Sequence, residues 1–258
     1  MPESFTDHFA PVAGAYAAHR PRYDEALFDW LATLAPRRTL AWDCGAGSGQ
    51  ATLPLADRFE RVVGTDASAG QLAGAPTHAR IEWRVAPAER SGLASASADL
   101  VTVAQALHWF DVPAFYREVD RVLAPGGVLA VWTYNRHRTD DPAVDEVVDR
   151  FYSETVGPYW PPERRLVEEG YRALPFPYPQ LPAPPFRMEA RWSLAELLGY
   201  IGSWSAVARY RAVRGSDPLV PLSRELESRW GNPAATRPVR WALTVRAGRR
   251  PGGTDSGP

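Results

Sequence analysis

Lysine is absent from this sequence, because all 29 basic residues are arginine. That absence excludes chemistry that needs a lysine amine, such as Schiff-base formation with a carbonyl substrate. A single cysteine, Cys44, excludes an intramolecular disulfide and any zinc site with several cysteine ligands. The formal net charge is only −1, so composition gives no sign of a basic surface for nucleic acid.

Long apolar runs are also missing. No stretch approaches the roughly 20 consecutive apolar residues that span a bilayer. Glu3 and Asp7 precede any apolar stretch, which is not the pattern of a secretion signal. These features predict a soluble, cytoplasmic protein without a membrane partner. The 258 residues suffice for one large domain, and both a monomer and a homodimer stay open.

A glycine-rich segment at 40–49 is the most informative feature that is present. An apolar stretch leads into Asp43, and Gly45, Gly47 and Gly49 then follow at alternate positions. Glycines allow sharp turns and close approach of the backbone to a ligand, because they carry no Cβ. A helix expected at 48–57 would point its free N–H groups at that ligand. Cys44 is interpreted as a small apolar spacer and not as a nucleophile.

A second acidic residue, Asp66, ends a strand expected at 61–66, about 20 residues further on, where a ribose-binding carboxylate is typical. Its alternative role is the N-cap of a helix that starts near Ala67 or Ser68. Dinucleotide sites usually show G-x-G-x-x-G. In this chain the third glycine comes one residue early and Gln50 follows it, which disfavours a nicotinamide cofactor.

Strand-like and helix-like patterns alternate over 37–156, which predicts an α/β fold with a Rossmann-like, mostly parallel sheet between two helix layers. Strands are expected at 38–43, 61–66, 80–86, 98–104 and 126–134, and helices at 48–57, 68–75, 112–123 and 142–154. Ligands of such sheets bind at the carboxyl ends of the strands. The glycine segment, Asp66 and residues 105–111 all fall at such ends.

Residues 105–111, Gln-Ala-Leu-His-Trp-Phe-Asp, are more aromatic and polar than a turn requires. With its ordinary pKa near 6.5, His108 would suit a general base. The alternative is a structural histidine held by hydrogen bonds. Trp109 and Phe110 are expected to form part of a substrate pocket.

Four further segments flank this core. Helices are expected in 1–36, a proline- and aromatic-rich cap or insertion at 157–185, and a disordered tail at 249–258. Residues 186–248 would hold helices at 193–213 and 218–230 and a final strand pair at 186–192 and 239–248.

The proline density of 157–185 excludes a sheet interior, and its aromatic residues favour an ordered cap over a linker. Tyr159 and Trp160 in this segment are candidate substrate contacts. Arg164 and Arg165 would suit a carboxylate substrate, although a solvated turn is the favoured interpretation for both.

Taken together, these segments resemble the class I S-adenosylmethionine-dependent methyltransferases of the type-11 group. The resemblance rests on Asp43-Cys-Gly-Ala-Gly-Ser-Gly49, Asp66, Ala88-Glu89, the 105–111 segment and Leu123-Ala-Pro-Gly-Gly127, and it covers 9–134. The Tyr16…Arg20-Pro21-x-Tyr23 opening and the 105–111 signature are similar to a subgroup that includes trans-aconitate methyltransferases.

The resemblance implies S-adenosylmethionine as cofactor and a small-molecule acceptor, such as a carboxylate or a natural-product hydroxyl. It implies a seven-stranded sheet whose last two strands are antiparallel to their neighbours, with a lid at 1–36 closing over the cofactor. The cofactor residues would be Tyr16, Arg20, Asp43, Gly45, Ala46, Gly47, Gly49, Asp66, Ala67, Ala88, Glu89, Gln105 and His108.

Within that set, Tyr16 and Arg20 would hold the methionine carboxylate, and Asp43 would anchor the loop and face the methionine amino group. Many members of the family carry an acid at the position of Pro87 that takes the adenine amino group. In this chain the adenine contact would fall to backbone groups of Ala88 and its neighbour Ala86, or to Glu89.

Two other functions stay open. An NAD(P)-dependent oxidoreductase is disfavoured by the early third glycine and by the missing Tyr-x-x-x-Lys pair. A non-methylating protein that binds the cofactor as a scaffold or a cyclase-like cage cannot be separated from a transferase by the loop alone. A nucleic acid substrate is disfavoured, because 105–108 carry no Asn/Asp-Pro-Pro-aromatic motif. No metal site is expected.

Overall fold

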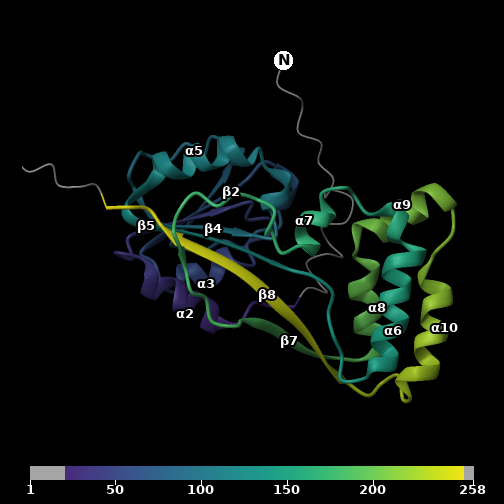
Figure 1. Cartoon of the computed structure of the whole chain (residues 1–258). Coiled ribbons are helices and arrows are strands. Elements are labelled where there is room, and N and C mark those ends of the chain that lie inside the picture. The colour runs from purple at the N-terminus through teal and green to yellow at the C-terminus, as the bar shows by residue number, and fades with distance from the viewer. Residues whose placement is uncertain (1–20, 253–258) are drawn as a thin grey trace, which may run out of the picture.

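The structure is a computed structural model that describes residues 21–252. Five parallel strands form the first part of its sheet (Figure 1). They are β1 (Leu40–Cys44), β2 (Arg61–Asp66), β3 (Ile81–Val85), β4 (Ala98–Ala104) and β5 (Leu123–Tyr134). β1 lies in the centre, between β2 and β4, while β3 and β5 pair with their outer edges. The predicted α/β fold with a mainly parallel sheet is confirmed.

An antiparallel part completes the sheet in the order β3-β2-β1-β4-β5-β8-β6. β8 (Arg237–Arg249) pairs with β5, and its other edge takes β6 (Gln180–Leu181) and β7 (Arg187–Trp192). All three pairings are antiparallel, as expected. The sheet has eight strands where seven were expected, because the outermost position is divided into two short strands. Prolines at 182, 184 and 185 separate them, and proline cannot donate a ladder hydrogen bond.

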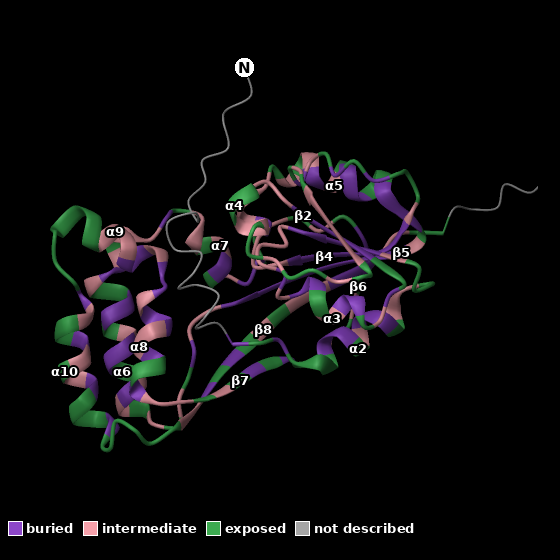
Figure 2. Cartoon of the chain, turned by 180° about the vertical axis from the view of Figure 1, so that it is seen from behind, coloured by how far each residue is buried: buried purple, intermediate pink, exposed green. Residues whose placement is uncertain are grey.

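Helices cover both faces of the sheet. α2 (Glu25–Leu34) and α3 (Thr52–Ala56) lie on one face, and α5 (Val112–Val122) lies on the other (Figure 1). Successive residues of β4 serve opposite faces: Leu100 packs with the α2 side, and Val101 packs with the α5 side. The central strands β1, β2, β4 and β5 are mostly buried, which explains why they read as nearly continuous apolar runs, whereas β7 and β8 alternate between buried and more exposed residues (Figure 2).

A group of helices stands at the end of the sheet toward which β5 runs (Figure 1). It consists of α6 (Pro142–Arg150), α8 (Leu194–Gly202), α9 (Ser205–Arg214) and α10 (Leu219–Trp230). The remaining helical segments are short: α4 (Ala69–Leu72), α7 (Arg164–Glu168) and the turns η2 (Leu107–Trp109), η3 (Phe151–Thr155) and η4 (Gly157–Tyr159). Within residues 21–252, none of the helices combines the length and the apolarity needed to cross a membrane.

Several element boundaries differ from the prediction. The helix expected at 193–213 is interrupted at Trp204, whose extended backbone (φ −70°, ψ 136°) separates α8 from α9. The helix expected at 48–57 begins only at Thr52, because the glycine loop continues to that point. β8 reaches Arg249, and the Arg250 N–H donates to the Gly127 carbonyl oxygen at 2.8 Å. The disordered tail predicted at 249–258 therefore begins too early, because Arg249 belongs to β8 and Arg250 is bonded to Gly127.

Candidate functional site

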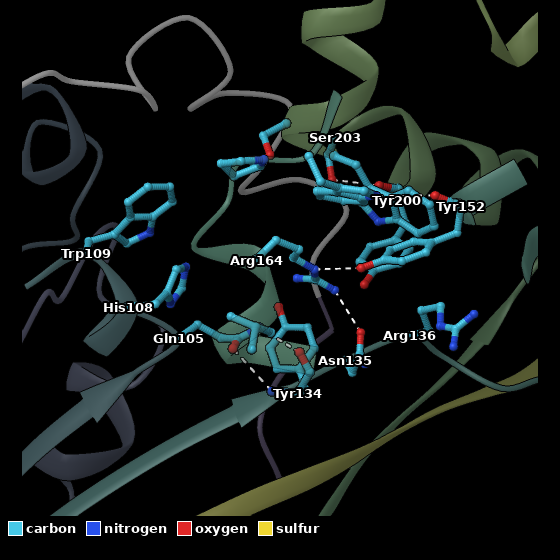
Figure 3. Close-up of a pocket in the computed structure, with 15 residues that line it drawn as sticks. Gln105, His108, Trp109, Tyr134, Asn135, Arg136, Tyr152, Arg164, Tyr200 and Ser203 are labelled. Carbon is cyan, nitrogen blue, oxygen red and sulfur yellow. Dashed lines mark hydrogen bonds between the residues drawn. The ribbon is translucent and has the colours of Figure 1, made fainter. Parts of the chain in front are cut away.

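Two cavities adjoin at the carboxyl ends of the parallel strands. The larger, of about 590 Å³, is lined by the glycine loop, by the ends of β2 and β3 and by the segment after β4. The smaller, of about 90 Å³, lies between that segment, the end of β5 and the helices that follow (Figure 3). Gln105, Trp109 and Tyr134 line both cavities. A molecule in the larger cavity would therefore meet one in the smaller cavity at these three side chains.

The three loop glycines all have a positive φ, and each is required for a different reason. A Cβ on Gly45 (φ +70°) would lie 2.5 Å from the Ala106 Cβ. A Cβ on Gly49 (φ +88°) would lie 2.7 Å from the Trp83 ring. Gly47 (φ +55°) meets no such neighbour, but it lines the larger cavity with its backbone. Gly49 is absent from the lining, so its role is packing and not ligand contact.

Asp66 lines the larger cavity and holds the loop. Its Oδ2 accepts the Gly47 N–H at 2.9 Å, and its Oδ1 accepts the Ser68 N–H at 2.9 Å. Ser68 is the N-cap of α4, so Asp66 does not have the capping role that was its alternative. A carboxylate oxygen accepts more than one hydrogen bond, so these two bonds do not by themselves exclude a ligand hydroxyl. Ala46 and Ala67 line the same wall.

Asp43 does not reach the cavity. Its side chain is fully buried, Oδ2 accepts the Thr52 hydroxyl at 2.6 Å, and Oδ1 accepts the Thr102 hydroxyl at 2.8 Å. Burial raises its pKa to about 6, although both hydroxyls counteract that effect. Asp43 thus ties β1 to β4 and to the start of α3. The expected contact with a methionine amino group disagrees with this arrangement, whereas the anchoring of the loop agrees with it.

The end of β3 contributes Pro87, Ala88 and Glu89 to the larger cavity. Glu89 Oε1 accepts the Asp111 N–H at 3.0 Å, and Asp111 in turn caps α5 through a bond with the Ala114 N–H at 3.1 Å. Glu89 therefore joins two loops of the cavity wall, and its carboxylate remains part of the lining.

Gln105 stands at the boundary of the two cavities with a strained backbone (φ +57°). The backbone of Tyr134 fixes its side chain, since Nε2 donates to the Tyr134 carbonyl at 3.0 Å and Oε1 accepts the Tyr134 N–H at 3.2 Å. The Thr133 hydroxyl also donates to Oε1. Left-handed conformations of non-glycine residues are costly and concentrate at functional sites.

His108 lines the smaller cavity, and its Nδ1 lies 2.9 Å from the Tyr171 hydroxyl. The pKa of His108 is lowered to about 3, mainly by burial and in part by the nearby Arg164. The imidazole is therefore neutral at neutral pH. This weighs against a general base that retains a substrate proton and favours the alternative of a histidine held by hydrogen bonds.

Arg164 faces the smaller cavity from α7 (Figure 3). Its Nε donates to the Tyr152 hydroxyl at 2.8 Å, its Nη2 donates to Asn135 Oδ1 at 2.9 Å, and its guanidinium lies 4.8 Å from the Trp160 ring centroid. No carboxylate of residues 21–252 forms an ion pair with it, whereas the neighbouring Arg165 is 82% exposed and pairs with Glu169. Both residues lie in helix α7 and not in a turn; the expected exposure to solvent is right for Arg165 and wrong for Arg164.

The other expected substrate contacts divide between the cavities. Trp109 and Trp160 line the smaller cavity, but Phe110 lines only the larger one. Tyr159 lines neither and contacts the Tyr210 ring at a centroid distance of 5.0 Å. The two expected lid contacts, Tyr16 and Arg20, lie outside the described residues.

Sequence reasoning missed most of the smaller cavity. The missed residues are Tyr134, Asn135, Arg136, Tyr152, Pro161, Val167, Tyr200, Ser203, Trp204 and Ser205. Tyr134 ends β5 and the next two residues follow it, so the rule that ligands bind at the carboxyl ends of strands would have identified all three. Of the others, Tyr152, Val167, Tyr200 and Ser205 lie in helical segments, and Pro161, Ser203 and Trp204 lie in the connections between such segments.

A family model and two similar proteins carry the name methyltransferase. A family described as a methyltransferase domain matches residues 42–131. A Dictyostelium discoideum protein named as a methyltransferase is 35% identical, with 87% of each chain covered. A solved structure from Anaeromyxobacter dehalogenans, named as a type II methyltransferase, is 50% identical, covers 90% of this chain and 99% of its own, and has a TM-score of 0.85.

A more distant structure shows likeness in fold alone. It is an N-methyltransferase of Haemonchus contortus, solved in complex with S-adenosylhomocysteine. It is 16% identical, with 97% of this chain and 61% of its own chain covered, and the TM-score is 0.50.

Proposed function

This chain belongs to the class I methyltransferases, and we propose that it transfers a methyl group from S-adenosylmethionine to a small-molecule acceptor. One observation carries the proposal: a larger cavity beneath the glycine loop adjoins a smaller aromatic cavity at Gln105, Trp109 and Tyr134. Two substrates that exchange a group need such a common boundary, because the reacting atoms must be held in line and close together.

The residues of the larger cavity fit S-adenosylmethionine. Its volume of about 590 Å³ lies in the range of small-molecule sites. Asp66 offers carboxylate oxygens to ribose hydroxyls, and Gly47 leaves its backbone open to the ligand. When bound, this cofactor supplies an electrophilic methyl group on a positively charged sulfur. The indole of Trp109 lies at the boundary and would stabilise a nearby cation through its ring face.

Alignment and exclusion of water are the contributions expected of this chain. Gln105 is held in one orientation by the backbone of Tyr134, so the boundary between donor and acceptor has a defined shape. The aromatic side chains of the smaller cavity keep that boundary poor in water. Its volume of about 90 Å³ favours a small acceptor.

Arg164 supports an acceptor molecule that carries an anionic group. Its guanidinium has neutral hydrogen-bond acceptors in Tyr152 and Asn135 and no ion pair within residues 21–252, so it retains N–H donors for a ligand. A carboxylate matches the planar donor geometry of arginine. The Trp160 ring below the guanidinium would contact the apolar body of the same molecule. This charge preference favours a carboxylic acid substrate.

Titration calorimetry with S-adenosylhomocysteine, NAD and NADP tests the cofactor. We expect the homocysteine compound alone to bind, and binding of a nicotinamide cofactor instead would favour the oxidoreductase. Asp66→Ala should weaken binding about tenfold or more, since a hydrogen bond to a charged group contributes roughly 1.5–3 kcal/mol. Asp57→Ala, at an exposed acid outside the cavity lining, is the control. Unchanged affinity in a folded Asp66→Ala protein would disprove the ribose contact.

A methyl donor with a labelled methyl group, incubated with a panel of small carboxylic acids and phenols, tests the transfer itself. Label in an acceptor would establish turnover. Cofactor binding without transfer to any member of a broad panel would favour the non-methylating scaffold or cyclase-like cage.

A further inference from the structure

Arg164 and Glu168 of α7 are four residues apart, a spacing at which side chains are neighbours on a helix surface. The adjacent pair on the same helix uses this spacing for an ion pair, with Arg165 Nε 2.7 Å from Glu169 Oε1. Between Arg164 and Glu168, by contrast, the Tyr152 hydroxyl bonds both side chains. We propose that this hydroxyl is a positioning group that keeps Arg164 from pairing with Glu168, and so keeps its guanidinium open as an anion site in the smaller cavity.

Hydrogen-bond chemistry fixes the direction of this bridge. A guanidinium can only donate, so Arg164 Nε donates to the Tyr152 oxygen, at 2.8 Å. Burial raises the pKa of Tyr152 to about 12, so the phenol keeps its proton at neutral pH. That proton is donated to Glu168 Oε1, because a carboxylate oxygen can only accept. The phenol therefore bonds both charged groups while it separates them.

The bridge leaves part of the guanidinium available to a ligand. Arg164 bonds the Tyr152 hydroxyl and Asn135 Oδ1, two neutral acceptors, and a guanidinium has more N–H donors than these contacts use (Figure 3). The Trp160 ring packs on it with 4.8 Å between the guanidinium carbon and the ring centroid. A direct pair with Glu168 would instead take up further N–H groups and cancel the charge. The interposed phenol thus preserves both the donors and the positive charge.

The backbone that carries Tyr152 is unusual, which supports a dedicated role. α6 continues into η3, a π-helical turn in which the Val156 N–H donates to the Phe151 carbonyl at 3.0 Å. Single π-helical turns are rare and occur frequently at functional sites. The Tyr152 side chain is also buried, and its ring packs against Trp160 with 4.9 Å between the centroids. Backbone and packing together hold the phenol in place beside Arg164.

The consequence for the acceptor rests on the proposed function. Arg136 also lines the smaller cavity, but it pairs directly with Asp149 at 2.8 Å. Arg164 is therefore the arginine of this lining that an anionic acceptor can bind without breaking an ion pair within residues 21–252. On this basis the Tyr152 hydroxyl determines specificity, because it maintains the preference of the cavity for an acid over a neutral molecule.

Titration calorimetry of the full chain with benzoate tests the proposal. We expect the wild type to bind benzoate and Arg164→Gln to lose the binding, which locates the anion site. In Tyr152→Phe, Arg164 can pair directly with Glu168, so benzoate binding should weaken about threefold or more, because the anion must then displace an ion pair. Wild-type affinity in a folded Tyr152→Phe protein would overturn the proposal.

Two double variants separate this charge effect from a change in packing. Adding Glu168→Gln to Tyr152→Phe removes the competing carboxylate and should restore the binding of benzoate. Adding Glu169→Gln to Tyr152→Phe is the matched control, because Glu169 lies on the same helix but pairs with Arg165, and it should not restore binding. Damage to packing would respond to neither addition. Equal benzoate affinities of the two double variants would contradict the proposal.

If the proteins with Tyr152→Phe do not fold, Glu168→Gln alone decides. The amide oxygen of glutamine still accepts the Tyr152 proton, so this variant should bind benzoate at least as tightly as the wild type. Weaker binding would overturn the proposal, and so would the absence of benzoate binding by the wild type. Binding of S-adenosylhomocysteine by the same sample reports on the proposed function separately.

Discussion

His137 gives the fold a defined sensitivity to acid. It is fully buried, neither ring nitrogen has a hydrogen-bond partner within residues 21–252, and the rings of Tyr200, Trp204 and Trp241 surround it. Its pKa is lowered from 6.5 to about 3, mainly by burial; the nearby Arg138 and Arg136 act in the same direction and Asp149 opposes them. In the unfolded chain, the imidazole regains its ordinary pKa.

The sign and size of the effect follow from these two values. Below pH 6.5 the imidazole of His137 binds a proton in the unfolded chain but not in the folded chain. The free energy of unfolding therefore falls as the pH falls, down to about pH 3. The linkage relation gives a loss of about 2 kcal/mol between pH 8 and pH 5 for this one group. That is a large part of the roughly 5–15 kcal/mol by which proteins are stable.

Urea unfolding at pH 8 and at pH 5 measures the loss, with His137→Leu as the perturbation. Leucine is apolar and close in size, so the variant should lose about 2 kcal/mol less than the wild type on acidification. Comparison across pH cancels any constant change in stability that the substitution causes. His78→Leu, at a histidine whose Nδ1 accepts the exposed Arg80 N–H, should behave like the wild type. An equal acid loss in His137→Leu and wild type would refute the reasoning.

Two further predictions concern packing and substrate charge. Gly64→Ala should destabilise the fold by roughly 1–3 kcal/mol in urea unfolding, because a Cβ would lie 2.6 Å from Trp83 Cε3. Gly74→Ala is the control and should cost little, because a Cβ there would lie 3.8 Å from its nearest neighbour. Equal stabilities of the two variants would disprove the clash. Arg164→Gln should raise the KM for a carboxylate acceptor about tenfold to a hundredfold, and Arg165→Gln should leave it unchanged. An equal effect of both variants would disprove the proposal that Arg164 binds an anionic group.

The cofactor half of the site was largely predictable from sequence, because its signals are local. The glycine loop and Asp66 each follow a strand that the pattern identifies, and both line the larger cavity in the structure. Asp43 shows the limit. Its partners Thr52 and Thr102 lie on α3 and β4, and the second pairing exists only once the sheet has formed. The adjacency of Asp43 to the loop suggested a ligand contact that tertiary packing excludes.

The acceptor half was poorly predictable, because helix rotation decides which side chain faces the cavity. Arg164 and Arg165 are adjacent in sequence, yet successive helix residues point about 100° apart. One lies beneath Tyr152 and over Trp160, and the other lies in solvent. Within the 157–185 segment, no periodic pattern is long enough to distinguish them.

The two halves of the site also differ in how freely they can diverge. Every described residue that lines the larger cavity, except Tyr134, precedes β5, and the family model matches residues 42–131. Most residues that line the smaller cavity come from the segment between β5 and β8, which are neighbouring strands in the sheet. This connecting segment is called the excursion. Mutations in that excursion can change which molecule is accepted while the inherited donor half stays intact. Relatives that share the glycine loop are thus free to differ in what they methylate.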